Sequence, residues 1–223
     1  MHKREFGKYL LYGALIIAGI CCYGMRYYFI GTSSKPINAK TNADFAIEDI
    51  HSSVDRDADG IDDQRDILLG ARAYIATEPV YKSKYYEGGY PNDKYGVCTD
   101  VVARALLAAG YDLKQLVNDD IIGSPLAYNI EEPDKNIDFR RVRNLQIYFQ
   151  RKGMALTLDV RDIEQWQGGD IVIFRQHIGI VSDMRNDNGV AYVIHHNSPF
   201  QAAYEQDILE KRQDIVGHYR VSQ

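Results

Sequence analysis

The chain has 223 residues, of which 45% are apolar, so it can form one domain of ordinary size with a proper core, but not two full domains. Its net charge is −5, from 26 basic and 31 acidic residues, so no general attraction to nucleic acid or to an anionic surface is expected. Of the three cysteines, only Cys98 lies outside an apolar N-terminal stretch, which excludes a disulfide-stapled domain.

The first 30 residues have the pattern of a signal anchor. Lys3, Arg4 and Lys8 precede an uncharged stretch from Tyr9 to Met25, close to the lower length limit of a membrane-spanning helix. No small-residue cleavage site follows, so we expect one uncleaved N-terminal membrane helix, with secretion as the outcome if the leader is removed. The position of the basic residues predicts a single-pass protein of the cell membrane whose domain lies on the extracytoplasmic side.

Residues 31–54 are rich in Ser, Thr, Asn and Ala without a sustained period, which predicts a flexible linker. An acidic loop follows at residues 55–66, where Gly60 permits a sharp turn and oxygen ligands at alternate positions can converge on one hard cation. The loop resembles the DxDxDG loops of EF-hand-like and thrombospondin type 3 repeats. It predicts a structural Ca²⁺ site with Asp55, Asp57, Asp59, the Ile61 carbonyl, Asp63 and Asp66 as ligands. The alternative is an acidic entry to the next helix, because carboxylates favour helix N-termini.

Helical periodicity dominates the first half of the remaining chain, residues 67–223. Apolar residues at helical spacing predict helices over residues 63–76, after Cys98, over 112–118 and over 140–149, with an irregular segment at 123–138. The Cys98 thiol falls in the first turn of its helix, where unpaired N–H groups and the helix dipole are expected to lower its pKa.

The last third of the sequence changes to strand patterns. Short apolar runs predict strands at residues 171–174, 177–183, 190–196 and 215–221, with a hairpin turn at 186–189. Antiparallel strands that follow helices predict an α+β fold, with the N-terminal helices packed on an antiparallel sheet.

A thiol nucleophile needs a base and a group that orients the base. His177 begins a strand, and Gly179, two residues later on the same face, is expected to leave room for the Cys98 helix. A hairpin brings His195 and His196 close to His177, and only one of them can share its face, because adjacent strand residues point to opposite sides. The alternatives are a structural strand histidine and a zinc site with Cys/His/His ligands.

Several separated motifs resemble the bacterial domain-of-unknown-function family numbered 1287. That family in turn looks like a branch of the NlpC-type papain-like superfamily of cell-wall cysteine peptidases and amidases. These motifs are Tyr95-Gly96-Val97-Cys98-Thr99-Asp100-Val101-Val102, Pro133 to Asp138 with Arg140-Arg141-Val142, Gly169-Asp170-Ile171-Val172, His177 to Asp183, and Gly217-His218-Tyr219-Arg220. The resemblance covers residues 67–222 and implies a papain-like NlpC-type catalytic domain. It departs at the nucleophile, where Val97-Cys98-Thr99-Asp100 stands in place of Asp-Cys-Ser-Gly, and in a longer hairpin before His195.

The resemblance implies that Cys98 is the nucleophile, His177 the general base and His195 the orienting third residue, with His196 as the alternate. It also implies a hydrolase acting on an amide bond of peptidoglycan stem peptides, with peptidoglycan or another cell-envelope polymer as partner and no cofactor for catalysis. The turn-rich stretch before Cys98 offers Tyr90 or Tyr95 to line a groove and donate a hydroxyl to the oxyanion. The alternatives are a binding module of the same fold that does not cleave its polymer and an acyltransferase that passes the acyl group to an amine.

Overall fold

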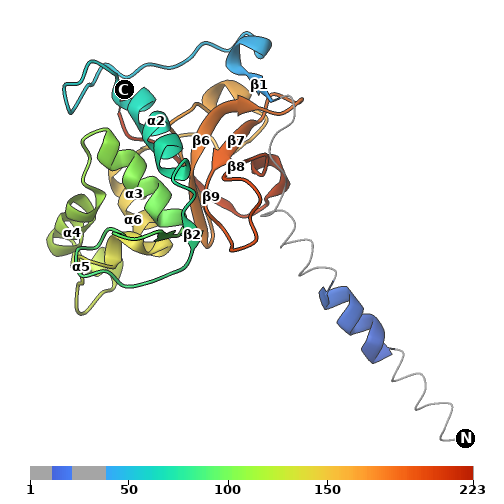
Figure 1. Ribbon diagram of the computed structural model, residues 1–223, viewed down its shortest axis with the longest axis horizontal. Helices are drawn as coiled ribbons and strands as arrows, with labels where there is room; N and C mark the ends of the chain where they lie inside the picture. The colour runs from blue at the N-terminus through green and yellow to red at the C-terminus, as the bar shows by residue number, and fades with distance from the viewer. Residues whose placement is uncertain (1–11, 22–38, 223) are drawn as a thin grey trace, which may run out of the picture.

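The computed structural model describes residues 12–21 and 39–222. From residue 39 onward the chain forms a layer of helices against an antiparallel sheet, which confirms the predicted α+β class (Figure 1). The main sheet has seven strands in the order β4-β9-β5-β6-β7-β8, and β1 pairs with β6 outside this path. The structure differs from the sequence-based expectation at the membrane helix and at the end of the N-terminal linker.

The predicted membrane helix is wrong. Within the described ranges, no helix combines the length and the apolar character needed to cross a bilayer. The only part of the apolar N-terminal stretch that is described is a helix over residues 12–21, whereas a span takes about 20 residues. The rest of the expected anchor, at 1–11 and 22–30, lies outside the described residues. The expected single-pass membrane location is withdrawn on the same finding.

Four helices form the helical layer: α2 (Asp63–Ile75), α3 (Cys98–Ala108), α4 (Leu113–Gly123) and α6 (Val142–Lys152). Each places its apolar stripe in one shared core that also includes strand residues such as Ile171, Ile178 and Ile180. Asp62 caps α2 by accepting a hydrogen bond from the Arg65 N–H. The start of α2 and the existence of α3 agree with the periodicity of the sequence. The sheet's other face packs on a second cluster, which includes Trp166, Val172 and Val193.

Strands β5 (Ile171–Phe174), β6 (His177–Arg185) and β7 (Ala191–Ile194) form the antiparallel meander that the sequence predicts. The last long strand, β9 (Ile215–Arg220), returns to the other side of β5. The remaining elements are short: β1 (Lys40–Thr41), β2 (Val80–Tyr81), β3 (Tyr95–Gly96), β4 (Met154–Ala155), β8 (Glu205–Gln206), α5 (Pro125–Tyr128) and the 3₁₀ turns η1 (Asn42–Phe45), η2 (Asp138–Arg140), η3 (Ile163–Gln165) and η4 (Leu209–Lys211).

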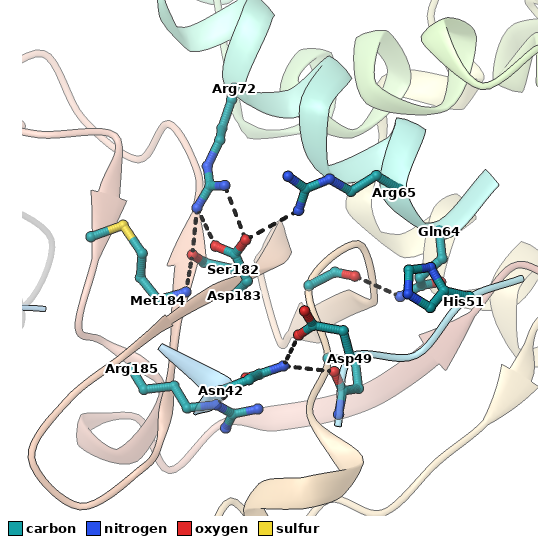
Figure 2. Close-up of polar contacts among 12 residues, drawn as sticks. Asn42, Asp49, His51, Gln64, Arg65, Arg72, Ser182, Asp183, Met184 and Arg185 are labelled. Atoms are coloured by element: carbon teal, nitrogen blue, oxygen red, sulfur yellow. Dashed lines mark hydrogen bonds and ion pairs between the residues drawn. The ribbon is translucent and has the colours of Figure 1, made fainter. Parts of the chain in front are cut away.

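The segment from residue 40 to 52 belongs to the folded domain, although it was expected in the flexible linker. Strand β1 pairs with the far end of β6, and the Asn42 side chain is hydrogen-bonded to Gln167 and Arg185. It also donates a hydrogen bond to Asp49, as Figure 2 shows. The Arg185 guanidinium is fully buried and donates to three backbone carbonyls, those of Ile163, Trp166 and Gly189, the last at 2.7 Å. These bonds satisfy a buried cation, so they fix the N-terminal segment on the sheet.

Helix α2 is tied to the sheet by an ion-pair network on β6. The Arg72 guanidinium binds both Asp183 and Glu205. Arg65, two helical turns before Arg72, reaches the same Asp183, as Figure 2 shows. Ser182, also on β6, donates to Glu205. Burial of Arg72 lowers its pKa, but the hydrogen bonds and charges of Asp183 and Glu205 outweigh this effect and raise the pKa above its usual value. The guanidinium therefore stays charged. This network fixes the helical layer relative to the strand that begins at His177.

Candidate active site

The N-terminus of α3 is held by a buried ion pair. Asp100 accepts a hydrogen bond from the Val97 N–H at 2.9 Å, which satisfies a free donor at the helix start. The same carboxylate binds Arg140 through two hydrogen bonds of 2.7 and 2.9 Å, and both side chains are almost fully buried. Arg140 comes from η2, which packs on α3. The position of Cys98, the first residue of α3, is therefore fixed by contacts from a segment 40 residues away.

Cys98 is partly exposed as a whole residue, while its sulfur is buried near the start of β6. The backbone N–H of Ile178 is within hydrogen-bonding reach of the sulfur and favours the thiolate, as do the N–H groups of the first turn of α3. Burial of the sulfur outweighs them and raises the pKa of Cys98 to about 11. The expected lowering of the thiol pKa is therefore not observed, because the sequence argument included the helix dipole but not the desolvation of the charge. The resting group is the neutral thiol.

The two predicted histidines contact each other across strands β6 and β7. His177 Nε2 lies 2.9 Å from His195 Nδ1, and His195 Nε2 lies 2.9 Å from Gln206 Oε1. The register explains the contact: Ile180 pairs with Ile194, so the residue after Ile194 stands opposite Gly179, on the same face as His177. Within the described residues, no hydrogen bond joins the Cys98 sulfur to the His177 ring.

Gly179 is required by strand β7 rather than by the Cys98 helix. A Cβ atom at this position would come within 2.6 Å of a Val193 methyl group and 2.8 Å of the Ile194 carbonyl oxygen. The expectation that Gly179 makes room for α3 is therefore wrong. Its lack of a side chain instead lets the next strand bring His195 close to His177.

The hydrogen bond to Gln206 determines which nitrogen carries the proton in the rings of His195 and His177. An amide oxygen can only accept, so its bond places the proton of His195 on Nε2 and leaves the Nδ1 lone pair to accept from His177 Nε2–H. The proton on Nε2 of His177 leaves its Nδ1 as the basic nitrogen. Burial, followed by the charges of His195 and Arg212, holds the pKa of His177 well below its usual value, and burial lowers that of His195 to about 3. Both rings are therefore neutral near pH 7.

His196, the alternate third residue, points elsewhere. Its ring packs edge-on against Tyr81 at 5.2 Å and Tyr204 at 5.1 Å between centroids. Its Nδ1 atom is buried without a hydrogen-bond partner in the described part of the chain, and burial lowers the pKa of His196 to about 4. The contact to His177 is thus made by His195 and not by His196.

The two tyrosines named from the sequence differ in their availability. The Tyr90 hydroxyl donates to Asp112 at 2.8 Å, beyond the C-terminal end of α3 and therefore at the opposite end of this helix from Cys98. A role for Tyr90 at an oxyanion is withdrawn for this reason. Tyr95 stays partly exposed three residues before Cys98, with the ammonium groups of Lys82 and Lys84 each 5.0 Å from its ring centroid.

Tyr81 and Gln206 are neighbours of the site that the sequence reasoning missed. Tyr81 pairs with Gly96 in the two-residue strands β2 and β3, and a charge on Cys98 would act on its hydroxyl and raise its pKa, in addition to the effect of burial. Gln206 lies in β8, opposite Val193. A strand of two residues is too short to show a period in the sequence. The only available signal was that Gly96, the partner of Tyr81, lies two residues before Cys98.

Oxygen ligands cluster in the acidic loop and not around the thiol. Among the described residues, Asp55, Asp57 and Asp59 form the group of three with ligand atoms within 4.8 Å of one another. Cys98 and the histidines do not form such a group, so the geometry does not favour the zinc alternative. Asp63, expected as a calcium ligand, uses one oxygen for the Arg56 N–H at 2.8 Å and the other for the Tyr111 hydroxyl.

Comparison with known proteins fits the extent of this domain. The family model described as "Domain of unknown function (DUF1287)" matches residues 68–221, and an uncharacterized protein, YijF of Escherichia coli strain K12, is 37% identical over 167 residues, which are 69% of this chain and 80% of YijF. The chain belongs to the DUF1287 family. The DUF1287 match includes Cys98, His177 and His195, whereas the acidic loop precedes it. No solved structure is matched by the chain.

Proposed function

We propose that the chain is a cysteine hydrolase that cleaves an amide bond, with Cys98 as nucleophile and His177 as general base. The observation that carries the proposal is the linked set at the start of β6: the Ile178 N–H faces the Cys98 sulfur, and the neighbouring His177 is bonded to His195 at 2.9 Å. A nucleophile, a base and a group that orients the base are the parts that covalent catalysis by a thiol requires.

The raised thiol pKa determines how the reaction would begin. Because Cys98 and His177 are both neutral at rest, the sulfur attacks the carbonyl carbon while His177 Nδ1 takes the thiol proton. His195 accepts the Nε2–H of His177 throughout, so the ring keeps the tautomer and orientation that a base needs. The thiol would thus lose its proton during the attack, as a hydroxyl nucleophile does. It would not be deprotonated before the substrate binds.

The remaining steps return every group to its starting state. The tetrahedral intermediate breaks its carbon–nitrogen bond, and His177 Nδ1 gives its proton to the leaving amine. Water then attacks the Cys98 thioester while His177 takes one of its protons, and that proton returns to the sulfur as the acid leaves. The negative charge on the carbonyl oxygen is assigned to the Cys98 backbone N–H and to the hydroxyl of Tyr81. Tyr81→Phe should lower kcat at unchanged stability, and unchanged kcat would remove this role.

The substrate class rests on the resemblance to NlpC-type peptidases, which implies stem peptides of peptidoglycan. Charge at the site supports an acidic peptide. Lys82 and Lys94 are exposed, and their ammonium groups lie 5.0 and 5.7 Å from the centre of the Tyr95 ring, three residues before the thiol. Carboxylates of a stem peptide would meet these cations on approach to Cys98.

Defined muropeptides incubated with the full chain and followed by mass spectrometry test the proposal. Hydrolysis should split one amide bond and add the mass of one water across the two products. Addition of methylamine separates the acyltransferase alternative, because a preference for amine over water would give the methylamide as the main product. Saturable binding without any product would replace the proposal by the binding-module alternative.

A further inference from the structure

The acidic loop before α2 has a feature that its own hydrogen bonds do not explain. Asp66 is 7% exposed, and its Oδ2 atom has no hydrogen-bond partner within the described part of the chain. A buried carboxylate oxygen without a partner is costly, because its hydration is lost and nothing replaces it. A bound cation would replace the hydration that this oxygen has lost.

The group that surrounds this oxygen is entirely acidic. The charges of Asp59, Asp57, Asp55 and Asp63 all act on the Asp66 carboxyl, while each of the first three contributes one oxygen to a cluster no wider than 4.8 Å. Two oxygens bound to one Ca²⁺ at about 2.3–2.6 Å can be at most about 5 Å apart, so the cluster fits a single coordination sphere. Three carboxylates therefore share one small region, and the Asp66 carboxyl lies close enough for all three charges to act on it.

We propose that this loop binds one Ca²⁺ through Asp55, Asp57, Asp59 and Asp66, with the Ile61 carbonyl as the main-chain ligand. An all-oxygen set favours a hard cation over zinc, and four carboxylates with a main-chain oxygen suit the larger coordination number of calcium better than magnesium. The unpartnered, nine-tenths buried oxygen of Asp66 is the observation that distinguishes this loop from an ordinary acidic turn.

The structure assigns Asp63 a different role from the one its spacing suggests. Its two oxygens hold the Arg56 N–H and the Tyr111 hydroxyl, while the Arg56 side chain donates to the Gly110 carbonyl at 3.0 Å. These contacts join the loop to the turn after α3. The cation would thus stiffen the junction between α2 and α3, the helix that begins at Cys98, without taking part in the chemistry.

The experiment compares the melting temperature of the full chain, freed of metal by a chelator, with and without CaCl₂. About 1 mM Ca²⁺ should raise the melting temperature of the wild type by roughly 3–6 °C, given a dissociation constant of about 0.1 mM. Isothermal titration should give about one site per chain. The variant Glu131→Gln/Glu132→Gln removes two exposed charges outside the loop and should respond like the wild type.

Two loop variants are expected to be at least as stable as the wild type without Ca²⁺ and less stable than the wild type with Ca²⁺. Asp66→Asn and Asp57→Asn/Asp59→Asn should match or exceed the metal-free wild type in melting temperature, because repulsion among the carboxylates is relieved. Neither should respond to CaCl₂. The proposal is overturned if the melting temperature of the wild type does not change with CaCl₂ up to about 10 mM. It is also overturned if CaCl₂ shifts the melting temperature of Asp57→Asn/Asp59→Asn as much as that of the wild type.

Discussion

His177 Nε2 lies 2.9 Å from His195 Nδ1, between the first residue of β6 and the residue that follows β7. The contact joins a base to an orienting group across two strands, and it exists because Gly179 lets those strands approach closely. The neighbouring His196 shares the sequence context but packs between two tyrosines instead. The two histidines therefore provide an internal comparison.

His195→Ala should lower kcat by about 10²–10⁴-fold with a smaller change in KM, because the His177 ring loses the partner that fixes its tautomer. His196→Ala removes a ring that packs on Tyr81 and Tyr204 and is not bonded to His177, so it should lower kcat much less. Steady-state kinetics on the same muropeptide measures both. A larger loss in His196→Ala than in His195→Ala would assign the third residue to His196.

Gln206→Leu should shift the proton of His195 away from Nε2, because the amide oxygen that accepts it at 2.9 Å is removed. Nitrogen-15 NMR of the imidazole rings reads the tautomer directly. In the wild type, both His177 and His195 should carry the proton on Nε2, and in Gln206→Leu a mixture of tautomers should appear together with reduced kcat. A wild-type spectrum with His177 protonated on Nδ1 contradicts this assignment.

Alkylation of Cys98 by iodoacetamide should become faster with pH across the whole range from 6 to 9.5. The thiolate is the reactive form, and because burial raises the pKa of Cys98 to about 11, its thiolate population falls about tenfold for each pH unit below that value. A free thiol of pKa about 8.5 levels off within the same range and serves as reference. A plateau already reached at pH 6 would indicate a stored thiolate–imidazolium pair instead.

Asp100→Asn should destabilise the domain by about 3–5 kcal/mol, because it leaves the buried Arg140 guanidinium without its charged partner. Denaturant unfolding measures the loss. Asp119→Asn, at an exposed position of α4, is the control and should change stability by less than about 0.5 kcal/mol. The double variant Asp100→Asn/Arg140→Met should recover part of the loss, and a double variant less stable than Asp100→Asn would contradict the explanation.

Sequence patterns predicted the parts of this fold that have a period. Helix α3, strands β5 and β6 and the turn before Gly189 follow from apolar spacing and turn residues. Strands β2 and β8 have two residues each and cannot be detected in this way, so Tyr81 and Gln206 escaped notice. Tertiary contacts also determine the ends of elements, as in α4, which runs to Gly123 instead of residue 118.

The contact between His177 and His195 could be predicted from the sequence, whereas the electrostatics of Cys98 could not. Strand alternation required one histidine of the pair to face His177, and the register assigns that place to His195. The pKa of Cys98 depends on how deeply the sulfur is buried, which no local pattern encodes. The N-terminal boundary was missed for a similar reason: a polar segment without a period becomes ordered when Asn42 bonds to Arg185, 143 residues away.

The most direct measurement of the central claim is the turnover of a defined muropeptide by Cys98→Ala, with Cys21→Ala as the matched cysteine control. We expect Cys98→Ala to lose at least about 10⁴-fold in kcat while its melting temperature stays close to that of the wild type. Cys21, which is exposed in the helix over residues 12–21, should be replaceable without loss of activity. Wild-type turnover by Cys98→Ala would contradict the assignment of Cys98 as the nucleophile.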